Sequence, residues 1–101
     1  MNLLNTTRQD FTGQTTTPTK VFSAGSRTGL QCHGSSDNGS TILIYLADAG
    51  AATPTMTAAN CDFEVGIGDT FVIDNYANAN KDVWIAAKSG TVAGNIKEIT
   101  T

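Results

Sequence analysis

Two cysteines and one histidine are the residues of this chain that could bind a metal or act as a nucleophile or base. Cys32 and His33 are adjacent, and Cys61 lies much farther along the chain. Structural zinc sites use about four such ligands, with paired cysteines a few residues apart, so this pattern predicts no metal site. A general base needs a neighbouring nucleophile or orienting carboxylate, and no recognisable motif supplies one for His33. We therefore expect a surface or turn histidine, no catalytic residue, no cofactor and no enzymatic activity.

The two cysteines are expected to be reduced. Residues 1–8 lack the basic segment and long apolar run of a secretory signal, which predicts a chain made and kept in the cytoplasm or released by lysis. Thiols stay reduced in that compartment, and both cysteines fall in segments that read as strands, where small apolar side chains suit a core. A disulfide between Cys32 and Cys61 is the alternative, and it would stabilise the fold by about 3.6 kcal/mol in the chain-entropy account.

Aromatic side chains offer a second kind of chemistry, because exposed rings on a sheet can stack on sugars. Tyr76 lies in a polar loop, and Trp84 alternates with Val83 and Ile85, so either face of that strand could be the buried one. Tyr76 and Trp84 are therefore candidate exposed contact residues, although a lone tryptophan in a small sandwich is more often buried. The seven Asp residues are dispersed and match neither a glycosidase pair nor a calcium loop.

Composition narrows the class of protein. The chain has 101 residues, the size of one domain, with 16 Thr and 8 Asn but only 2 Glu and 4 Lys. Abundant β-branched and scarce long helix-forming side chains favour sheet. A net charge of −3 with six scattered basic residues argues against nucleic-acid binding. No apolar run approaches the roughly 18 residues that a membrane-spanning helix needs.

Short strand patterns separated by turns recur through residues 21–101 and predict an all-β fold. We expect a small antiparallel β-sandwich or barrel of the jelly-roll or immunoglobulin-like type. The apolar run over 41–47 predicts a central strand covered on both faces. Residues 48–60 read as a loop with a weak strand over 55–57. The expected core consists of large apolar residues on these strands, namely Val21, Phe22, Ile42, Ile44, Leu46, Phe63, Val65, Phe71, Ile73, Val83, Ile85, Ile96 and Ile99.

Residues 1–20 differ from the rest of the chain. They contain seven Thr and Pro18, and they sustain no strand or helix periodicity. This pattern predicts an extended N-terminal arm, with a disordered tail as the alternative. Leu3, Leu4 and Phe11 are the candidate anchors through which the arm would bind a partner, and without that partner the arm should be solvated.

The C-terminal third resembles the ending of small β proteins from tailed-phage virions. The resemblance rests on three segments: Gly68-Asp69-Thr70-Phe71-Val72-Ile73-Asp74, then Val83-Trp84-Ile85-Ala86-Ala87-Lys88-Ser89-Gly90-Thr91, then Ile96-Lys97-Glu98-Ile99. It implies a capsid decoration (cement) protein on the virion surface. Such a protein stabilises the phage head by binding across subunits of the major capsid protein. The resemblance also implies a homo-oligomer, with a homotrimer favoured.

A carbohydrate- or receptor-binding module of a phage tail or adhesin is the alternative function. An exposed platform formed by Tyr76 and Trp84 would favour sugar binding, whereas buried aromatic rings and an ordered arm would favour the decoration role. An N-terminal segment folded back over Trp84 would instead favour an independent binding module.

Overall fold

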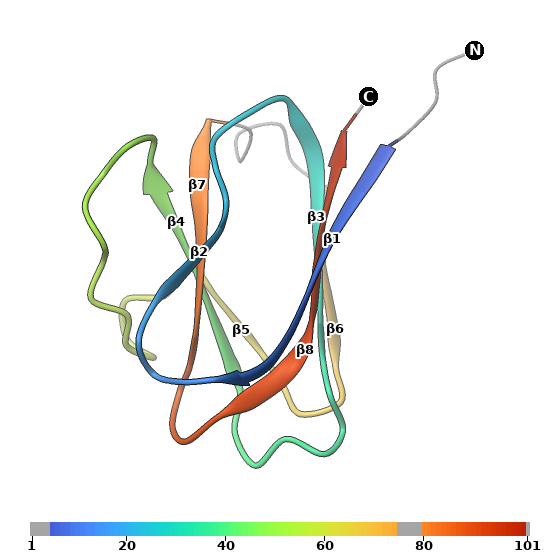
Figure 1. The fold of residues 1–101 in the computed structure, drawn as a ribbon, viewed down its shortest axis with the longest axis vertical. Helices are drawn as coiled ribbons and strands as arrows, with labels where there is room; N and C mark the ends of the chain where they lie inside the picture. Colours follow the sequence, from blue (N-terminus) through green and yellow to red (C-terminus); the bar gives the residue numbers. More distant parts are fainter. Residues whose placement is uncertain (1–4, 75–79, 101) are drawn as a thin grey trace.

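The computed structural model describes residues 5–74 and 80–100, which form eight strands and no helix. The strands are β1 (Asn5–Gln14), β2 (Thr19–Phe22), β3 (Arg27–Gly34), β4 (Ile42–Asp48), β5 (Phe63–Val65), β6 (Thr70–Ile73), β7 (Lys81–Ala87) and β8 (Val92–Thr100). They build two antiparallel sheets that pack face to face (Figure 1), sheet A with the order β1-β8-β3-β6 and sheet B with the order β2-β7-β4-β5. The predicted all-β class is confirmed. No helix that could cross a membrane occurs among these residues.

The strand order is that of a jelly roll. Strand β1 pairs with β8 and β3 with β6 in sheet A, and β2 pairs with β7 and β4 with β5 in sheet B. The two pairs of sheet A are joined by β3 and β8, and those of sheet B by β4 and β7. The first half of the chain thus faces the second half in reverse order, like a long hairpin rolled into two sheets. Two separate sheets, rather than a closed barrel, enclose the core.

Strands β4 and β7 occupy the centre of sheet B, as the apolar run at the start of β4 predicts. Ile44 from β4 and Ile85 from β7 lie opposite each other and are both 0% exposed on the face toward sheet A. On the other face, Leu43 and Ala86 are opposite each other and are also buried. A strand that is apolar on both faces is stable only where both faces are covered.

The core between the sheets consists of alternating strand residues that face inward: Phe22, Leu30, Cys32, Ile42, Ile44, Val65, Ile73, Val83, Ile85, Ala87, Val92 and Ile96, with Phe11, Val21, Leu46, Phe63 and Phe71 packed against them. Every predicted core residue except Ile99 is in this set. Ile96 and Ile99 are three residues apart on one strand, so their side chains point to opposite faces. Ile99 therefore lies on the outer face of sheet A, against Gly29.

Residues 5–20 do not form the expected free arm, because they contain strand β1 and the start of β2. Strand β1 pairs with β8 from Asn5 opposite Thr100 to Phe11 opposite Gly94, and residues 19–20 begin strand β2. Without β1, strand β8 would have an unpaired edge. By pairing with β8, the Thr-rich segment satisfies its own backbone N–H and C=O groups. The sandwich thus begins before residue 21.

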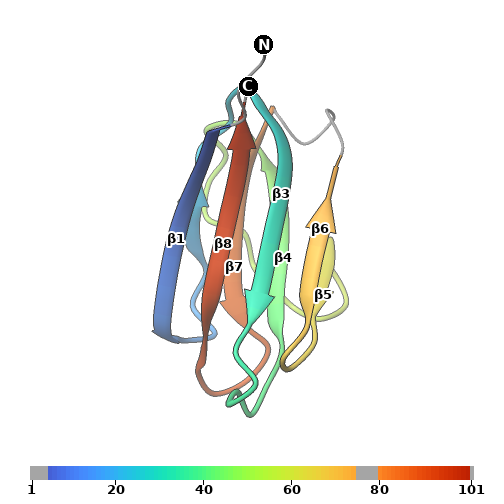
Figure 2. The same ribbon diagram turned by 90° about the vertical axis from the view of Figure 1, so that its right-hand side faces the viewer.

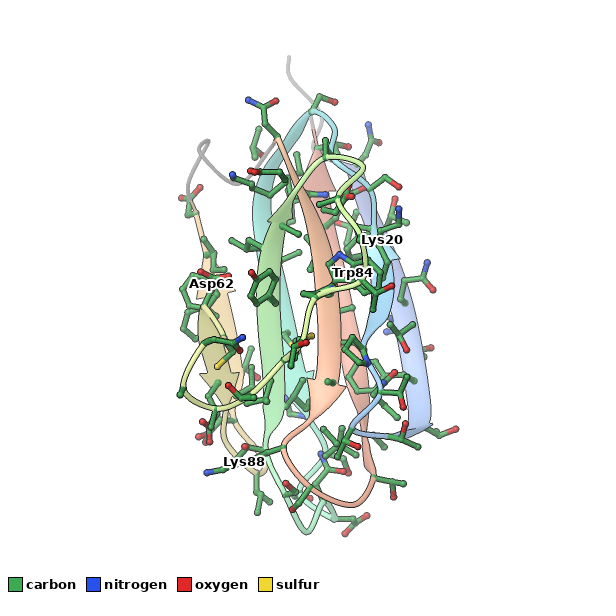
Figure 3. The ribbon with its side chains drawn as sticks, turned by 90° about the vertical axis from the view of Figure 1, so that its left-hand side faces the viewer. Lys20, Asp62, Trp84 and Lys88 are labelled. Carbon is green, nitrogen blue, oxygen red and sulfur yellow. The ribbon has the colours of Figure 1, made fainter. Side chains whose placement is uncertain are left out.

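A long segment between β4 and β5, residues 49–62, forms an outer cover on sheet B. It runs across the outer side of β4 and β7 (Figure 3). The N–H of Asp62 donates to the carbonyl of Ile44 at 2.9 Å, and a carboxylate oxygen of Asp62 accepts from the N–H of Leu46 at 2.7 Å. The weak strand expected over 55–57 is not formed; Thr57 instead makes a turn with Asn60. Such side-chain bonds to nearby backbone compete with strand pairing.

Both cysteines are free thiols, as predicted, and no disulfide joins them. Cys32 lies in the core on β3, where burial raises the pKa of its thiol to about 12. Cys61 does not lie in a strand as expected. It is half-buried at the end of the covering segment, and its Sγ lies 3.6 Å from the carbonyl of Ala58. Desolvation, followed by the nearby carboxylate of Glu64, raises the pKa of this thiol as well.

Candidate functional site

The structure separates the sequence-predicted site residues. Phe11 lies at the inner face of sheet A and packs on the core, whereas Trp84 lies on sheet B. Leu3, Leu4 and Tyr76 fall outside the described residues. Phe11 is therefore engaged within its own chain and is not available as an anchor for a partner.

Trp84 is not an exposed contact residue. Val83 and Ile85 face the core, so Trp84 points to the outer face of sheet B, between Lys20 on β2 and Tyr45 on β4. Its side chain lies beneath the covering segment (Figure 3), and only 8% of the residue is exposed. Its buried Nε1 has no hydrogen-bond partner among residues 5–74 and 80–100. With residues 49–62 in place, the indole ring cannot stack on a sugar.

Asp82 is a buried carboxylate that holds two loops onto strand β7. Its Oδ1 accepts a hydrogen bond from the N–H of Ala24 at 2.8 Å, and its Oδ2 accepts one from the N–H of Gly50 at 3.0 Å. The ammonium group of Lys20 lies 3.9 Å from Oδ2. The hydrogen bond from Ala24, then that from Gly50, lowers the pKa of Asp82 below its ordinary value, and burial opposes this shift. Asp82 therefore fastens the start of the segment that covers Trp84.

We expect Asp82→Asn to destabilise the fold at neutral pH and to reduce its sensitivity to acid. The amide would point an N–H at one of two backbone donors. A lowered folded-state pKa gives a contribution to stability that is present above about pH 4, the unfolded value, and is lost as the pH falls through the folded value. The difference in melting temperature between wild type and variant should therefore shrink from pH 7 toward pH 2, as followed by circular dichroism. Asp37→Asn, on an exposed turn, is the control; the same pH profile for both variants would contradict this role.

Arg27 is a buried cation that links the two sheets. The residue is 1% exposed; Nε donates to Glu98 Oε2 at 3.1 Å, and the other guanidinium nitrogens donate to the carbonyls of Lys81 at 2.8 Å and Ser23 at 2.7 Å. These partners lie on β8, on β7 and in the loop before β3. A planar guanidinium can satisfy several such acceptors at once, so Arg27 acts as a structural clamp at one end of the sandwich.

His33 and the possible metal ligands are the groups from which the sequence could suggest chemistry. His33 is half-buried on β3, not in a turn, and its Nδ1 lies 2.8 Å from Thr70 Oγ1. Residues 5–74 and 80–100 contain no group of three or more His, Cys, Asp and Glu side chains that could hold a metal ion.

Strand β1 is a long edge strand whose first six residues are exposed. It spans ten residues at one edge of sheet A and pairs on one side only, with β8 (Figure 2). Residues 5–10 are exposed throughout, and Arg8 Nε forms an ion pair with Asp10 Oδ1 at 3.0 Å. A bulge near Gly13, whose φ is 64°, ends the regular pairing. An edge strand of this length can accept a further strand, which makes β1 the candidate interaction surface.

Comparison with known proteins gives likenesses at the level of the fold. No known family matches the sequence, and no curated protein does. The solved structure of the SPBc2 prophage-derived protein YomS matches with a TM-score of 0.60 and 18% identity, covering 98% of this chain and 95% of YomS. A chain from the structure described as Bacillus endospore appendages, a novel family of disulfide-linked pili, matches with a TM-score of 0.51 and 10% identity, covering 96% of this chain and 83% of that one. At these identities the likeness shows a shared fold.

Proposed function

We propose that this chain is a structural protein of a phage particle that binds the capsid surface as a decoration protein. The observation that carries the proposal is the likeness to YomS, a prophage-derived protein, over nearly the full length of both chains. The second likeness, to a protein of spore appendages described as pili, adds an example of this fold in a repeating assembly. The proposed partner is the major capsid protein, and the proposed state is a homo-oligomer on the virion surface.

The proposed contact uses the edge of β1 in place of a free arm. Each backbone hydrogen bond to a capsid strand would contribute about 0.5–1.5 kcal/mol. Repetition of the contact by capsid symmetry would make a modest single contact effective. Leu3 and Leu4, directly before β1, remain the proposed apolar anchors; Phe11 is removed from that set because it packs on the core.

Binding to purified heads tests this proposal. Heads of the encoding phage, prepared without this protein, should bind the added chain on co-sedimentation and should gain resistance to heat. Deleting residues 2–17 is unsuitable, because it would remove β1 and uncover β8. The double variant Leu3→Ser/Leu4→Ser leaves β1 intact and should bind more weakly, whereas Ile67→Ser, at an exposed turn, should bind normally. Failure of the wild-type chain to bind heads would refute the decoration role.

A self-contained carbohydrate- or receptor-binding module is the second candidate. One observation favours it: the segment before residue 21 folds onto its own chain, and Lys20 of β2 lies opposite Trp84 in the pairing with β7. A segment that is engaged in this way is not free to bind a neighbouring subunit. The burial of Trp84 supports the structural role instead, because a covered ring offers no stacking platform. Titration with oligosaccharides of the host surface, followed by the fluorescence of the single Trp, separates the two candidates. Saturable binding of a glycan without binding to heads would favour the module.

A further inference from the structure

We propose that strand β1 pairs with β1 of a second copy of this chain, antiparallel and about a two-fold axis at Gln9. The contact would join two copies of sheet A into one continuous sheet. The pairing concerns the free chain, and it uses the same open edge of β1 as the proposed capsid contact. A copy that binds a capsid strand through β1 would therefore separate from its partner copy.

The first support is the open edge of β1. Among the four edge strands, β1 has ten residues, whereas β2 and β6 have four each and β5 has three. In an antiparallel pair, alternate residues direct their N–H and C=O groups away from the neighbouring strand, so one side of β1 presents a row of unpaired groups. All residues from Asn5 to Asp10 are exposed.

The second support is a charge pattern that complements itself. Phe11 faces the core, so by alternation Arg8 and Asp10 both lie on the outer face of sheet A. In a two-fold pairing centred on Gln9, Arg8 of each copy lies opposite Asp10 of the other. Moving the axis to residue 8 or to residue 10 would place two arginines or two aspartates opposite each other, which destabilises a strand pair. The charges therefore favour the register centred on Gln9 over the two adjacent ones.

The neighbouring strand strengthens the case. Arg8 lies opposite Lys97 of β8, and both side chains are on the outer face because Ile96 faces the core. Arg8 thus has a positive charge on its paired side and Asp10 of its own strand two residues away. Asp10 of a second copy would place a negative charge on the open side of Arg8. The two-fold contact is isologous, so it closes after two copies.

Charge reversal tests the pairing directly, without capsids. Wild type should sediment as a dimer that dissociates on dilution. Arg8→Asp or Asp10→Arg alone would bring four like charges together and should raise the dissociation constant about tenfold or more. Arg8→Asp/Asp10→Arg in one chain should restore the dimer, and an equimolar mixture of the two single variants should form mixed dimers.

Controls keep the result specific to β1. Asp37→Arg and Lys88→Asp reverse exposed charges away from this strand and should leave the dissociation constant unchanged. Circular dichroism verifies that each variant is folded. A monomer at the highest soluble concentration, or an oligomer of any size that neither reversal weakens, would overturn the β1 contact. Such a result would not bear on binding to phage heads, which the co-sedimentation experiment tests separately.

Discussion

Replacing Arg27 with methionine is expected to lower the free energy of unfolding by about 3–5 kcal/mol. The guanidinium is buried, and it joins Glu98 of sheet A to the carbonyl of Lys81 in sheet B and to that of Ser23. Methionine fills similar space but donates no hydrogen bond, so the carboxylate and two carbonyls lose their shared donor. Chemical denaturation followed by circular dichroism measures the loss.

Two further variants separate the loss of the Arg27 hydrogen bonds from the loss of a positive charge. Arg27→Lys keeps the charge but lacks the planar fork, so it should recover little of the lost stability. Lys88→Met breaks an exposed ion pair with Glu64, whose atoms are 3.6 Å apart, and should cost about 0–1 kcal/mol. A cost for Arg27→Met as small as that for Lys88→Met would show that the sheets are held together without the clamp.

Truncating Ile44 to alanine should cost about 2–5 kcal/mol, because the side chain is 0% exposed on a central strand. Sheet A covers it from the inner side, and β5 and β7 flank β4, so the surrounding structure can relax little into the cavity. Ile44→Val removes one methyl(ene) group and should cost about 0.5–1.5 kcal/mol. Denaturant midpoints at constant slope give both values.

Val72→Ala is the matched control for core truncation. Val72 lies on the edge strand β6 and is 60% exposed, so its truncation should change stability by less than about 0.5 kcal/mol. If Ile44→Ala and Val72→Ala had similar small costs, residues 42–48 would not be a central strand. Comparable melting curves for the two variants would therefore contradict the sheet order.

The strongly patterned strands could be predicted from the sequence, because burial on one or both faces leaves a local signal. The run that contains Ile44 is apolar on both faces, and β4 lies at the centre of sheet B as expected. Strand β1 gives no such signal. Asn5 to Asp10 are all polar and exposed, and this strand is defined by pairing with β8 at the far end of the chain. Periodicity within a window cannot reveal a pairing of that kind.

The buried polar residues were missed for a related reason. Asp82 and Arg27 bind backbone groups from loops and strands that are distant in sequence, so no spacing marks them. Trp84 shows that alternation along a strand predicts the face on which a side chain lies but not whether that face is covered. Its neighbours fix it to the outer face of sheet B, yet it is buried because residues 49–62, which read as a loop, cross that face. Coverage by an irregular segment depends on its path in space, not on a local pattern.

Quantitative mass spectrometry of purified particles of the encoding phage is the most direct test of the proposed function. If the chain decorates the capsid, it should be present in heads freed of tails, at a copy number comparable to that of the major capsid protein or a simple fraction of it. A phage lacking the gene should yield heads without the chain that are less resistant to heat. Absence of the chain from intact particles would contradict the decoration role.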